Sequence, residues 1–368
     1  MLPISISQIN SFKPANLIKI FTWAILRQFQ FKNKKKYETV FFVDRNTSSI
    51  ENLYKPNNVK VENKLTKSSL IFINKFKISL ILKHFFRLPD LRIIDKNFFL
   101  TSEASTRMRL WFYDFSSISE RNDYKNTSLS NLRKLISQYK NSKICILGTG
   151  PSFNKAIESF PNNNEVIITC NSSIYDDSLW KDENIFLCFA DPVYHFGTSE
   201  EALKFKKEVI NKFSKKNFFI ICPIECFPIL KYEWKIDERF IIGLETNSSS
   251  TYKDSGGKYI AMKKTSNVLT EFMLPVATML GKNIYLGGFD GRDKDELNFW
   301  KYSNSTNQDI DSHKLTHTSF FKDRDMSKYY SKHIKIFEKQ IISLEKRGFN
   351  FINLTKSNID FLNSRNGI

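Results

Sequence analysis

The chain has 368 residues, a mass of 43.2 kDa, a formal net charge of +18 and a pI of about 9.5. This length accommodates one catalytic domain with an appendage. Aromatic residues make up 14% of the chain while Gly and Pro are few, which excludes an intrinsically disordered protein. No apolar run reaches the about 18 residues that a transmembrane helix needs, and no signal peptide is recognised, so we expect a cytoplasmic protein.

The basic charge is concentrated in the N-terminal part of the chain. Residues 1–140 carry 25 Lys and Arg against 10 Asp and Glu, whereas the remaining 228 residues carry 31 against 28. Two apolar stretches in this part, residues 17–31 and 67–87, contain interspersed basic residues. This composition suits helices that lie on an anionic membrane surface, and equally helices that pack in a core with their lysines in water. Binding to nucleic acid is favoured by the positive charge alone, and we expect none because no zinc-finger or RNP-like motif occurs.

We therefore predict that residues 1–130 form a basic, aromatic-rich extension or small domain on the membrane or acceptor side of the protein. Within it, residues 38–44 and 91–100 fit either strands or helix ends. Residues 120–131 are polar and rich in turn-forming residues, so we expect the domain boundary there.

From residue 142 the pattern changes to alternating strands and helices. Expected strands cover residues 144–147, 166–170, 185–190, 218–222, 284–286 and 349–354, and expected helices cover 151–159, 199–214, 268–280 and 326–347. This alternation is typical of an α/β fold with a Rossmann-like, doubly wound, mostly parallel sheet. We assign it to a catalytic domain over residues 142–368.

A glycine turn follows the first of these strands, in the segment Lys143–Ser152 with the sequence KICILGTGPS. Gly148, Thr149 and Gly150 form the turn, and Pro151 and Ser152 open the next helix, where proline is favoured. Such a turn directs free backbone N–H groups and the positive end of the helix dipole toward one point, which favours a phosphate. A short GxG segment is equally compatible with an ordinary turn.

Polar residues also follow the other expected strands. Asn171 and Ser172 follow the second strand, Asp191 the third, and Gly288 and Asp290 the strand at 284–286. In open α/β sheets ligands bind outside the carboxyl ends of the strands, so these residues together predict a nucleotide-sized site. Taken alone, each of these residues is more often a turn residue or a helix cap than a ligand contact.

Two of the five histidines, His313 and His317, lie in the polar segment Asp309–Asp325. Their i,i+4 spacing would suit metal ligands on a helix, but the segment is a poor helix and lacks the Glu of an HExxH site. A loop histidine that reaches a pocket suits general acid–base chemistry near neutral pH. His195, four residues after Asp191, is a further residue expected to line the cleft.

Five cysteines are scattered through the apolar runs of residues 145–226. An odd number in such positions indicates reduced, buried thiols. Cys222 and Cys226 have no second pair nearby, so we do not expect a zinc site.

These motifs resemble the Campylobacter-type bacterial sialyltransferases of glycosyltransferase family 42 and the related motility accessory factor proteins. The resemblance covers residues 142–356 and leaves the basic N-terminal region unmatched. It rests on segments that occur in the family's order: Gly148–Ser152, Cys170-Asn171, Phe189–Pro192, Ile284–Asp290 and Ser312–Thr318.

The resemblance implies a GT-A-like, metal-independent, inverting transferase without a cofactor, which takes a CMP-activated sialic or other nonulosonic acid as donor. It implies His317 as general base, and contacts to the cytidine nucleotide from Gly148, Thr149, Gly150, Pro151, Ser152, Asn171, Ser172, Asp191, Ser266, Asn267, Thr270, Gly288 and Asp290. Candidates for substrate or phosphate contacts are His313, Trp300 and Tyr302, with Tyr329 and Tyr330 as further tyrosines. The acceptor would be a glycan or glycolipid of the bacterial surface, reached from the inner face of the membrane by a peripherally associated enzyme.

The chain departs from the family pattern at several positions. Thr149 and Asp191 stand where the family has Asn, and the Ser-Gly pair ahead of the apolar helix is replaced by Ser266-Asn267. A carboxylate at Asp191 would repel an anionic donor unless it contacts a hydroxyl. Two alternatives stay open: a pyrophosphokinase-like or other nucleotide-dependent transferase on the same scaffold, and a non-enzymatic, membrane-associated nucleotide-binding module.

Overall fold

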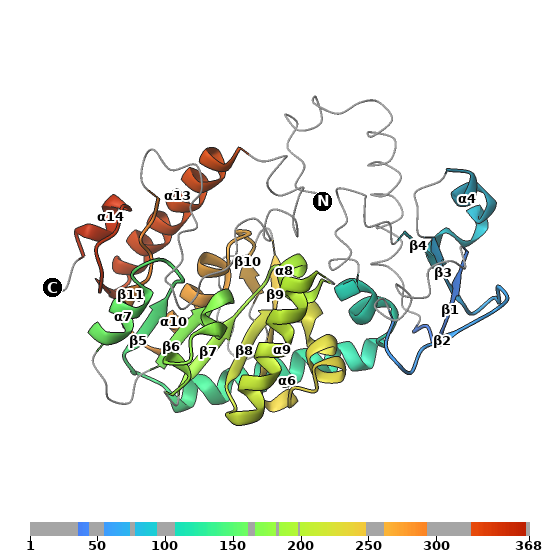
Figure 1. The fold of residues 1–368 in the computed structure, drawn as a ribbon, viewed down its shortest axis with the longest axis horizontal. Helices are drawn as coiled ribbons and strands as arrows, with labels where there is room; N and C mark the ends of the chain where they lie inside the picture. The colour runs from blue at the N-terminus through green and yellow to red at the C-terminus, as the bar shows by residue number, and fades with distance from the viewer. Residues whose placement is uncertain are drawn as a thin grey trace. The chain divides into compact units, whose positions relative to one another are not determined.

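The computed structural model describes residues 36–43, 55–73, 78–93, 107–160, 166–181, 184–197, 199–247, 261–292 and 325–365. The chain divides into two units (Figure 1). The N-terminal unit comprises Met1–Asp123 with Phe196–Thr198, and the C-terminal unit comprises Tyr124–His195 with Ser199–Ile368. No helix among the described residues is long and apolar enough to cross a membrane.

The C-terminal unit is built on an eight-stranded sheet of order β10-β9-β8-β7-β6-β5-β11-β12, in which every neighbouring pair is parallel. This confirms the predicted α/β fold with a parallel, doubly wound sheet. Its strands are β5 (Ile144–Leu147), β6 (Val166–Cys170), β7 (Ile185–Cys188), β8 (Phe219–Pro223), β9 (Ile241–Asn247), β10 (Ala261–Lys263), β11 (Asn283–Gly287) and β12 (Asn350–Asn353).

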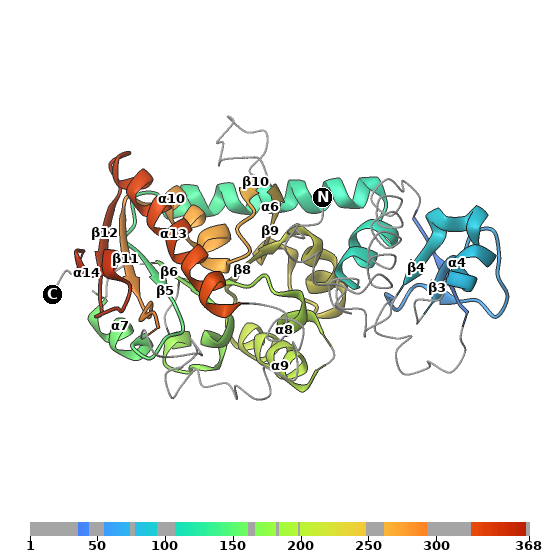
Figure 2. The ribbon, with the colours of Figure 1, turned by 90° about the horizontal axis from the view of Figure 1, so that it is seen from above.

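Helices cover both faces of this sheet. Figure 2 shows α6, α10 and α13 on one face and α7, α8 and α9 on the other. The helices are α6 (Ile118–Gln138), α7 (Phe153–Ser159), α8 (Pro192–Phe196), α9 (Glu200–Lys215), α10 (Leu274–Leu280), α13 (Met326–Glu345) and α14 (Asp360–Asn363). Single turns of 3-10 helix form η3 (Asn171–Tyr175), η4 (Leu179–Lys181), η5 (Ile224–Cys226) and η7 (Glu238–Phe240), and π-turns form η6 (Ile229–Glu233) and η8 (Leu269–Met273).

The central strands are apolar because both of their faces are covered. Every residue of β5, β6 and β7 is buried, as expected for strands between two helical layers. The predicted bounds of the first two strands coincide with β5 and β6. All five cysteines are buried free thiols, as the sequence indicated, and burial raises the pKa of Cys170 to about 12.

The prediction that residues 120–131 are rich in turns is wrong, because they lie inside the 21-residue helix α6, but the division between the two units does fall among them, between Asp123 and Tyr124. The buried residues of α6, Tyr124, Ser128, Asn131, Leu132 and Leu135, recur at helical spacing, but two of them are polar. Asn131 donates from Nδ2 to the carbonyls of Glu238 and Ile241, at 2.7 and 2.9 Å, and Ser128 Oγ accepts the Gly243 N–H at 3.0 Å. The buried face of α6 is therefore held to the start of β9 by hydrogen bonds, which hydropathy does not reveal.

The N-terminal unit contains a second parallel sheet, of order β2-β1-β3-β4. Its elements are β1 (Thr39–Phe42), β2 (Lys60–Val61), β3 (Leu70–Ile73), α4 (Ile78–Lys83), η1 (Phe85–Asp90), β4 (Leu91–Ile93) and the π-turn η2 (Leu110–Asp114). Strands were one of the two expectations for residues 38–44 and 91–100. The interpretation of residues 67–87 as one surface or packing helix is wrong, because all four residues of β3 are buried in a strand. The other such stretch, residues 17–31, lies outside the described residues.

A buried ion pair joins β4 to η2 in the N-terminal unit. Arg92 is fully buried, and its guanidinium donates to both carboxylate oxygens of Asp114, at 2.9 and 2.6 Å. It also donates to the carbonyls of Pro89 and Leu91, at 2.6 and 2.9 Å. Because the charge is fully out of water, it depends on these partners for compensation.

We predict that Asp114→Ala costs about 3–5 kcal/mol, because it leaves the buried guanidinium without a counter-charge. Hydrogen exchange of the β1, β3 and β4 amides measures the loss within this unit. Lys36→Ala is the matched control, since it removes the partly exposed Lys36–Glu120 pair and should cost at most about 1 kcal/mol. Equal costs for the two variants would contradict a special role for the buried pair.

Candidate functional site

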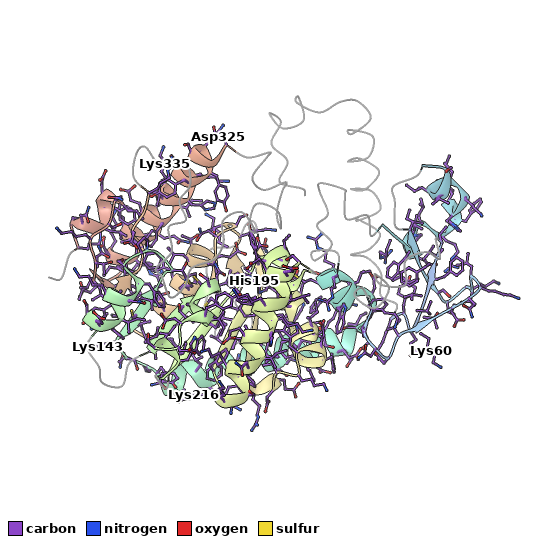
Figure 3. The ribbon with its side chains drawn as sticks, in the orientation of Figure 1. Lys60, Lys143, His195, Lys216, Asp325 and Lys335 are labelled. Atoms are coloured by element: carbon purple, nitrogen blue, oxygen red, sulfur yellow. The ribbon has the colours of Figure 1, made fainter. Side chains whose placement is uncertain are left out.

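The order of strands reverses between β5 and β11. From β5 the chain adds β6 to β10 on one side of the sheet, and it then returns to place β11 and β12 on the other side. In open α/β sheets this switch point opens a crevice at the carboxyl ends of the strands. Figure 3 shows those ends at the edge where His195 lies, whereas Lys143 and Lys216, which precede β5 and β8, lie at the opposite edge. The candidate site is therefore at the ends of β5 and β11.

Glycines let the two turns at this point touch through their backbones. The N–H of Gly148 donates to the Gly287 carbonyl at 2.8 Å, and that of Gly150 to the Gly288 carbonyl at 3.0 Å. A Cβ on Gly148 would lie 2.6 Å from the Gly288 oxygen, and one on Gly288 would overlap the Gly148 carbonyl. Gly288 also has a φ of +69°, which other residues rarely adopt. These glycines are required for the approach of one turn to the other.

Asp290 joins the same two turns through its side chain. Its carboxylate accepts the Ser152 N–H, with oxygen distances of 3.1 and 3.2 Å, at the start of α7. The loop after β12 closes on this pair: Ser152 Oγ donates to Thr355 Oγ1 at 3.0 Å, and the Asn358 N–H donates to the Asp290 carbonyl at 2.6 Å. Three loops that are distant in sequence are thus fixed around one carboxylate.

The expectation that the glycine turn presents free N–H groups to a phosphate is therefore wrong for three of its donors. Gly148, Gly150 and Ser152 donate within the protein, and Pro151 has no N–H. An anion at the Ser152 N–H would meet the Asp290 carboxylate, and like charges at such distances repel strongly. A phosphate, if bound, would contact other groups than this N–H, while a carboxylate such as that of Asp290 suits the hydroxyl groups of a sugar.

A hollow of about 410 Å³ lies beside Asp290. Its lining residues are Asp290, Lys356, Ser357, Asn358 and Asn363. This volume is within the range of small-molecule sites. Lys356 is exposed and brings a positive charge to the same hollow as the Asp290 carboxylate. Sequence reasoning missed the loop after β12, although a polar run directly after the last strand was the available signal.

Buried hydroxyl groups follow β6, the strand next to β5. Asn171 adopts a positive φ of +49°, which asparagine tolerates. Ser172 and Ser173 are buried, and within the described part of the chain neither hydroxyl has a hydrogen-bond partner. Buried polar groups are normally paired, so these hydroxyls are candidates to bind a ligand.

Two of the predicted cleft residues have structural partners instead. Asp191 Oδ1 accepts the N–H groups of Val193 and Tyr194, at 2.7 and 3.0 Å, and so caps α8. His195 is 4% exposed and packs between the rings of Phe189 and Phe205, with ring centroids 5.1 and 4.5 Å away. The expectation that His195 lines the cleft is wrong, because the side chain belongs to an aromatic cluster.

Of the predicted nucleotide-binding residues in this part of the chain, Ser266 and Asn267 precede the π-turn η8, and Thr270 lies buried inside it. Ser266 has a φ of +62°, and the carboxylate of Glu271 accepts the N–H groups of Thr265 and Ser266, both at 2.8 Å. Burial raises the pKa of Glu271, and the two backbone hydrogen bonds oppose that rise. Sequence reasoning missed Glu271; its signal was an acid inside an apolar helix.

Adjacent tyrosines of α13 connect this loop to the end of β11. Tyr329 donates from its hydroxyl to the Ser266 carbonyl at 3.2 Å. The Tyr330 hydroxyl accepts the Arg292 N–H at 3.0 Å, and the Arg292 guanidinium lies 5.4 Å from the centre of the Tyr330 ring. The loop after β10 is in this way brought beside the Asp290 turn, although β10 lies at the far edge of the sheet from β11.

Four predicted residues lie outside the described residues: Trp300, Tyr302, His313 and His317. Among the described residues no group of three or more His, Cys, Asp or Glu side chains is arranged to hold a metal ion.

No protein-family model matches the chain, and no curated protein matches it. Two solved structures, both of the sialyltransferase CstII from Campylobacter jejuni, match the chain at low similarity. The complex with the substrate analogue CMP-3FNeuAc is 15% identical, with a TM-score of 0.29, over 58% of this chain and 81% of that one. The complex with cytidine-5'-monophosphate is 20% identical, with a TM-score of 0.32, over 62% of this chain and 85% of that one. Likeness at this level says nothing of the reaction.

We predict that Glu271 lowers stability as the pH rises above its ordinary pKa of 4.5. Below pH 4.5 the carboxyl is protonated in the folded and the unfolded chain alike. Above it the unfolded chain ionises first, so the free energy of unfolding falls until the pH passes the raised pKa of the folded state. Denaturant unfolding between pH 4 and 8 should show Glu271→Gln gaining stability relative to the wild type over this window. A constant difference would contradict the raised pKa.

Proposed function

We propose that the chain is an inverting, metal-independent glycosyltransferase that moves a sialic acid or related nonulosonic acid from its CMP-activated form to a hydroxyl of a bacterial surface glycan. The observation that carries this proposal is the hollow at the switch point, where Asp290 and Lys356 lie together among the loops after β11 and β12. Two of the segments that resemble the family 42 enzymes, Gly148–Ser152 and Ile284–Asp290, meet at this point.

The chemistry of the lining residues suits such a donor. A carboxylate accepts hydrogen bonds from vicinal sugar hydroxyls, which is the role we assign to Asp290 toward the ribose or the transferred sugar. The donor carries a phosphate and a carboxylate, and we assign their counter-charge to Lys356. The unpaired hydroxyls of Ser172 and Ser173 are further donors for oxygen atoms of the nucleotide.

The proposed reaction is a single displacement. The acceptor hydroxyl oxygen attacks the anomeric carbon, the bond from that carbon to the phosphate oxygen breaks, and its electron pair leaves with CMP. We assign the removal of the hydroxyl proton to His317, since an imidazole is half-ionised near neutral pH. Hydrogen-bond donors around the phosphate would stabilise the developing charge.

We predict that CMP raises the melting temperature in the presence of EDTA, and that added Mg²⁺ changes this little. At about a hundredfold its dissociation constant, CMP should stabilise the protein by about 2.7 kcal/mol. Asp290→Ala should lose the shift. Stabilisation by ATP only with Mg²⁺ would instead support a pyrophosphokinase-like enzyme, and nucleotide binding without any transfer would support a binding module.

The same protein tests the general base. His317→Ala should lower transfer by about 10²–10⁴-fold and leave the CMP shift unchanged. His84→Ala, a histidine of the N-terminal unit, is the matched control and should retain transfer. Equal loss of binding and transfer in His317→Ala would contradict its role as base.

We further propose that the N-terminal unit attaches peripherally to an anionic membrane surface. Leu82, Phe85 and Phe86 are 64%, 56% and 98% exposed, and Lys83 lies among them. Arg87 holds this segment rigidly, because it donates to Asp90 and to the carbonyls of Thr66 and Ser69. Residues 1–123 carry 21 Lys and Arg against 10 Asp and Glu, which complements anionic lipid.

We predict that the protein sediments with vesicles containing phosphatidylglycerol and not with pure phosphatidylcholine. The triple change Leu82→Ser, Phe85→Ser, Phe86→Ser should abolish sedimentation, since each apolar side chain buried in lipid contributes about 1.5–3 kcal/mol. Serine at the exposed Leu203, Tyr232 and Ile342 is the matched control and should retain it. A change in oligomeric state with no effect on vesicles would show that the patch binds a second copy.

A further inference from the structure

Glu271 has an arrangement that an ordinary helix start would not produce. Asn267 caps the helix, since its Oδ1 accepts the Leu269 N–H at 3.0 Å. In a usual capping box the acid three residues after the cap reaches back to the N–H of the cap residue. Here the acid is four residues after the cap, and it reaches the N–H groups of Thr265 and Ser266. The π-turn η8 accommodates the extra residue.

This carboxylate holds a backbone conformation that serine adopts with difficulty. Ser266 has a φ of +62°, in the left-handed region where a Cβ is crowded. The two N–H groups that Glu271 accepts belong to Ser266 and to the residue before it. Its carboxylate therefore stabilises the strained residue directly, and Tyr329 fixes the same residue from the carbonyl side.

The hydrogen bonds to Glu271 also determine what the loop can offer to a ligand. With both of these N–H groups occupied, the side-chain donors left in the loop include the Ser266 hydroxyl and the Asn267 amide nitrogen, and neither has a hydrogen bond to the residues that the structure describes. Ser266 is exposed and Asn267 is half-buried, so both can be reached by a ligand. Their positions depend on the left-handed turn.

We propose that Glu271 is a positioning residue for donor binding, which holds Ser266 in the left-handed conformation so that Ser266 and Asn267 face the nucleotide. This inference rests on the proposed use of a CMP-sugar. Glu271 itself touches no substrate and acts only through the loop. A second contact supports the position of Glu271. Gln340 of α13 donates to the Thr270 carbonyl at 3.0 Å, and this hydrogen bond fixes the π-turn that carries Glu271.

The test compares Glu271→Met with Glu271→Gln. Methionine has a similar size but no acceptor, whereas glutamine keeps an oxygen for both N–H groups. We expect the Met variant to bind CMP by calorimetry on the order of tenfold more weakly and to raise the donor KM with little change in kcat, while Gln stays within about twofold of the wild type. Hydrogen exchange at Thr265 and Ser266 should accelerate in the Met variant alone.

Two further comparisons separate positioning from general stability. Glu233→Met changes an acid in another π-turn and should lower the melting temperature without altering CMP binding. In a Ser266→Gly background Glu271→Met should weaken CMP binding less than in the wild type, because glycine adopts the left-handed conformation without strain.

If Glu271→Met lowers only the melting temperature and binds CMP as the wild type does, the inference is overturned and the proposed function stands. If Glu271→Gln weakens CMP binding as much as Glu271→Met does, binding depends on the carboxylate charge and not on its acceptor geometry, and the inference is also overturned. If the wild-type protein binds no CMP, the proposed function fails and the inference fails with it.

Discussion

The approach of the β5 turn to the β11 turn determines the rest of the site. The N–H groups of Gly148 and Gly150 in the β5 turn donate to the carbonyls of the β11 turn, and this is possible only because Gly148 and Gly288 lack a Cβ. The same approach brings the Asp290 carboxylate to the Ser152 N–H. A carboxylate at the start of a helix stabilises that helix and satisfies one of its unpaired donors. The ends of β5, β11 and β12 are thus held together before any ligand binds.

This constraint changes which groups can recognise an anionic nucleotide. In many nucleotide-binding folds the first glycine turn supplies N–H groups to the phosphate. Here an internal carboxylate has taken that place, so side-chain donors have to do this work. Under the proposed function this role falls to Lys356, which lines the hollow beside Asp290, and to the buried hydroxyls after β6.

The sequence predicted the parts of the fold that depend on hydropathy. The strands β5 and β6 are short, predominantly apolar runs between polar turns, which is the pattern expected of a strand buried on both faces. Helix α6 was missed because Ser128 and Asn131 occupy its buried face and bond to the backbone of β9. The strand β3 was misinterpreted because the residues between it and α4, 74–77, contain no glycine or proline that would mark a break. In both cases tertiary partners decided the structure, and periodicity could not reveal them.

For the site, sequence reasoning found the residues at the strand ends but not how they are used. Asp191 and Asp290 both follow a strand, yet the first caps the helix after it while the second reaches across the switch point to another loop. The difference lies in strand order, which the sequence does not state.

Each of the three π-turns among the described residues contains an acidic residue whose partners the sequence did not reveal. Asp114, Glu233 and Glu271 lie in η2, η6 and η8, and they bond respectively to Arg92, to Lys206 and to backbone N–H groups. A π-turn inserts one residue and so rotates the residues after it relative to an ideal helix. Within η8 this places Glu271 toward the preceding loop while Phe272 and Met273 enter the core. A pattern search with a period of 3.6 reads such an acid as a defect in an apolar face. In the folded chain the added residue lets η8 bury Phe272 and Met273 in the core and also hold the preceding polar loop through Glu271.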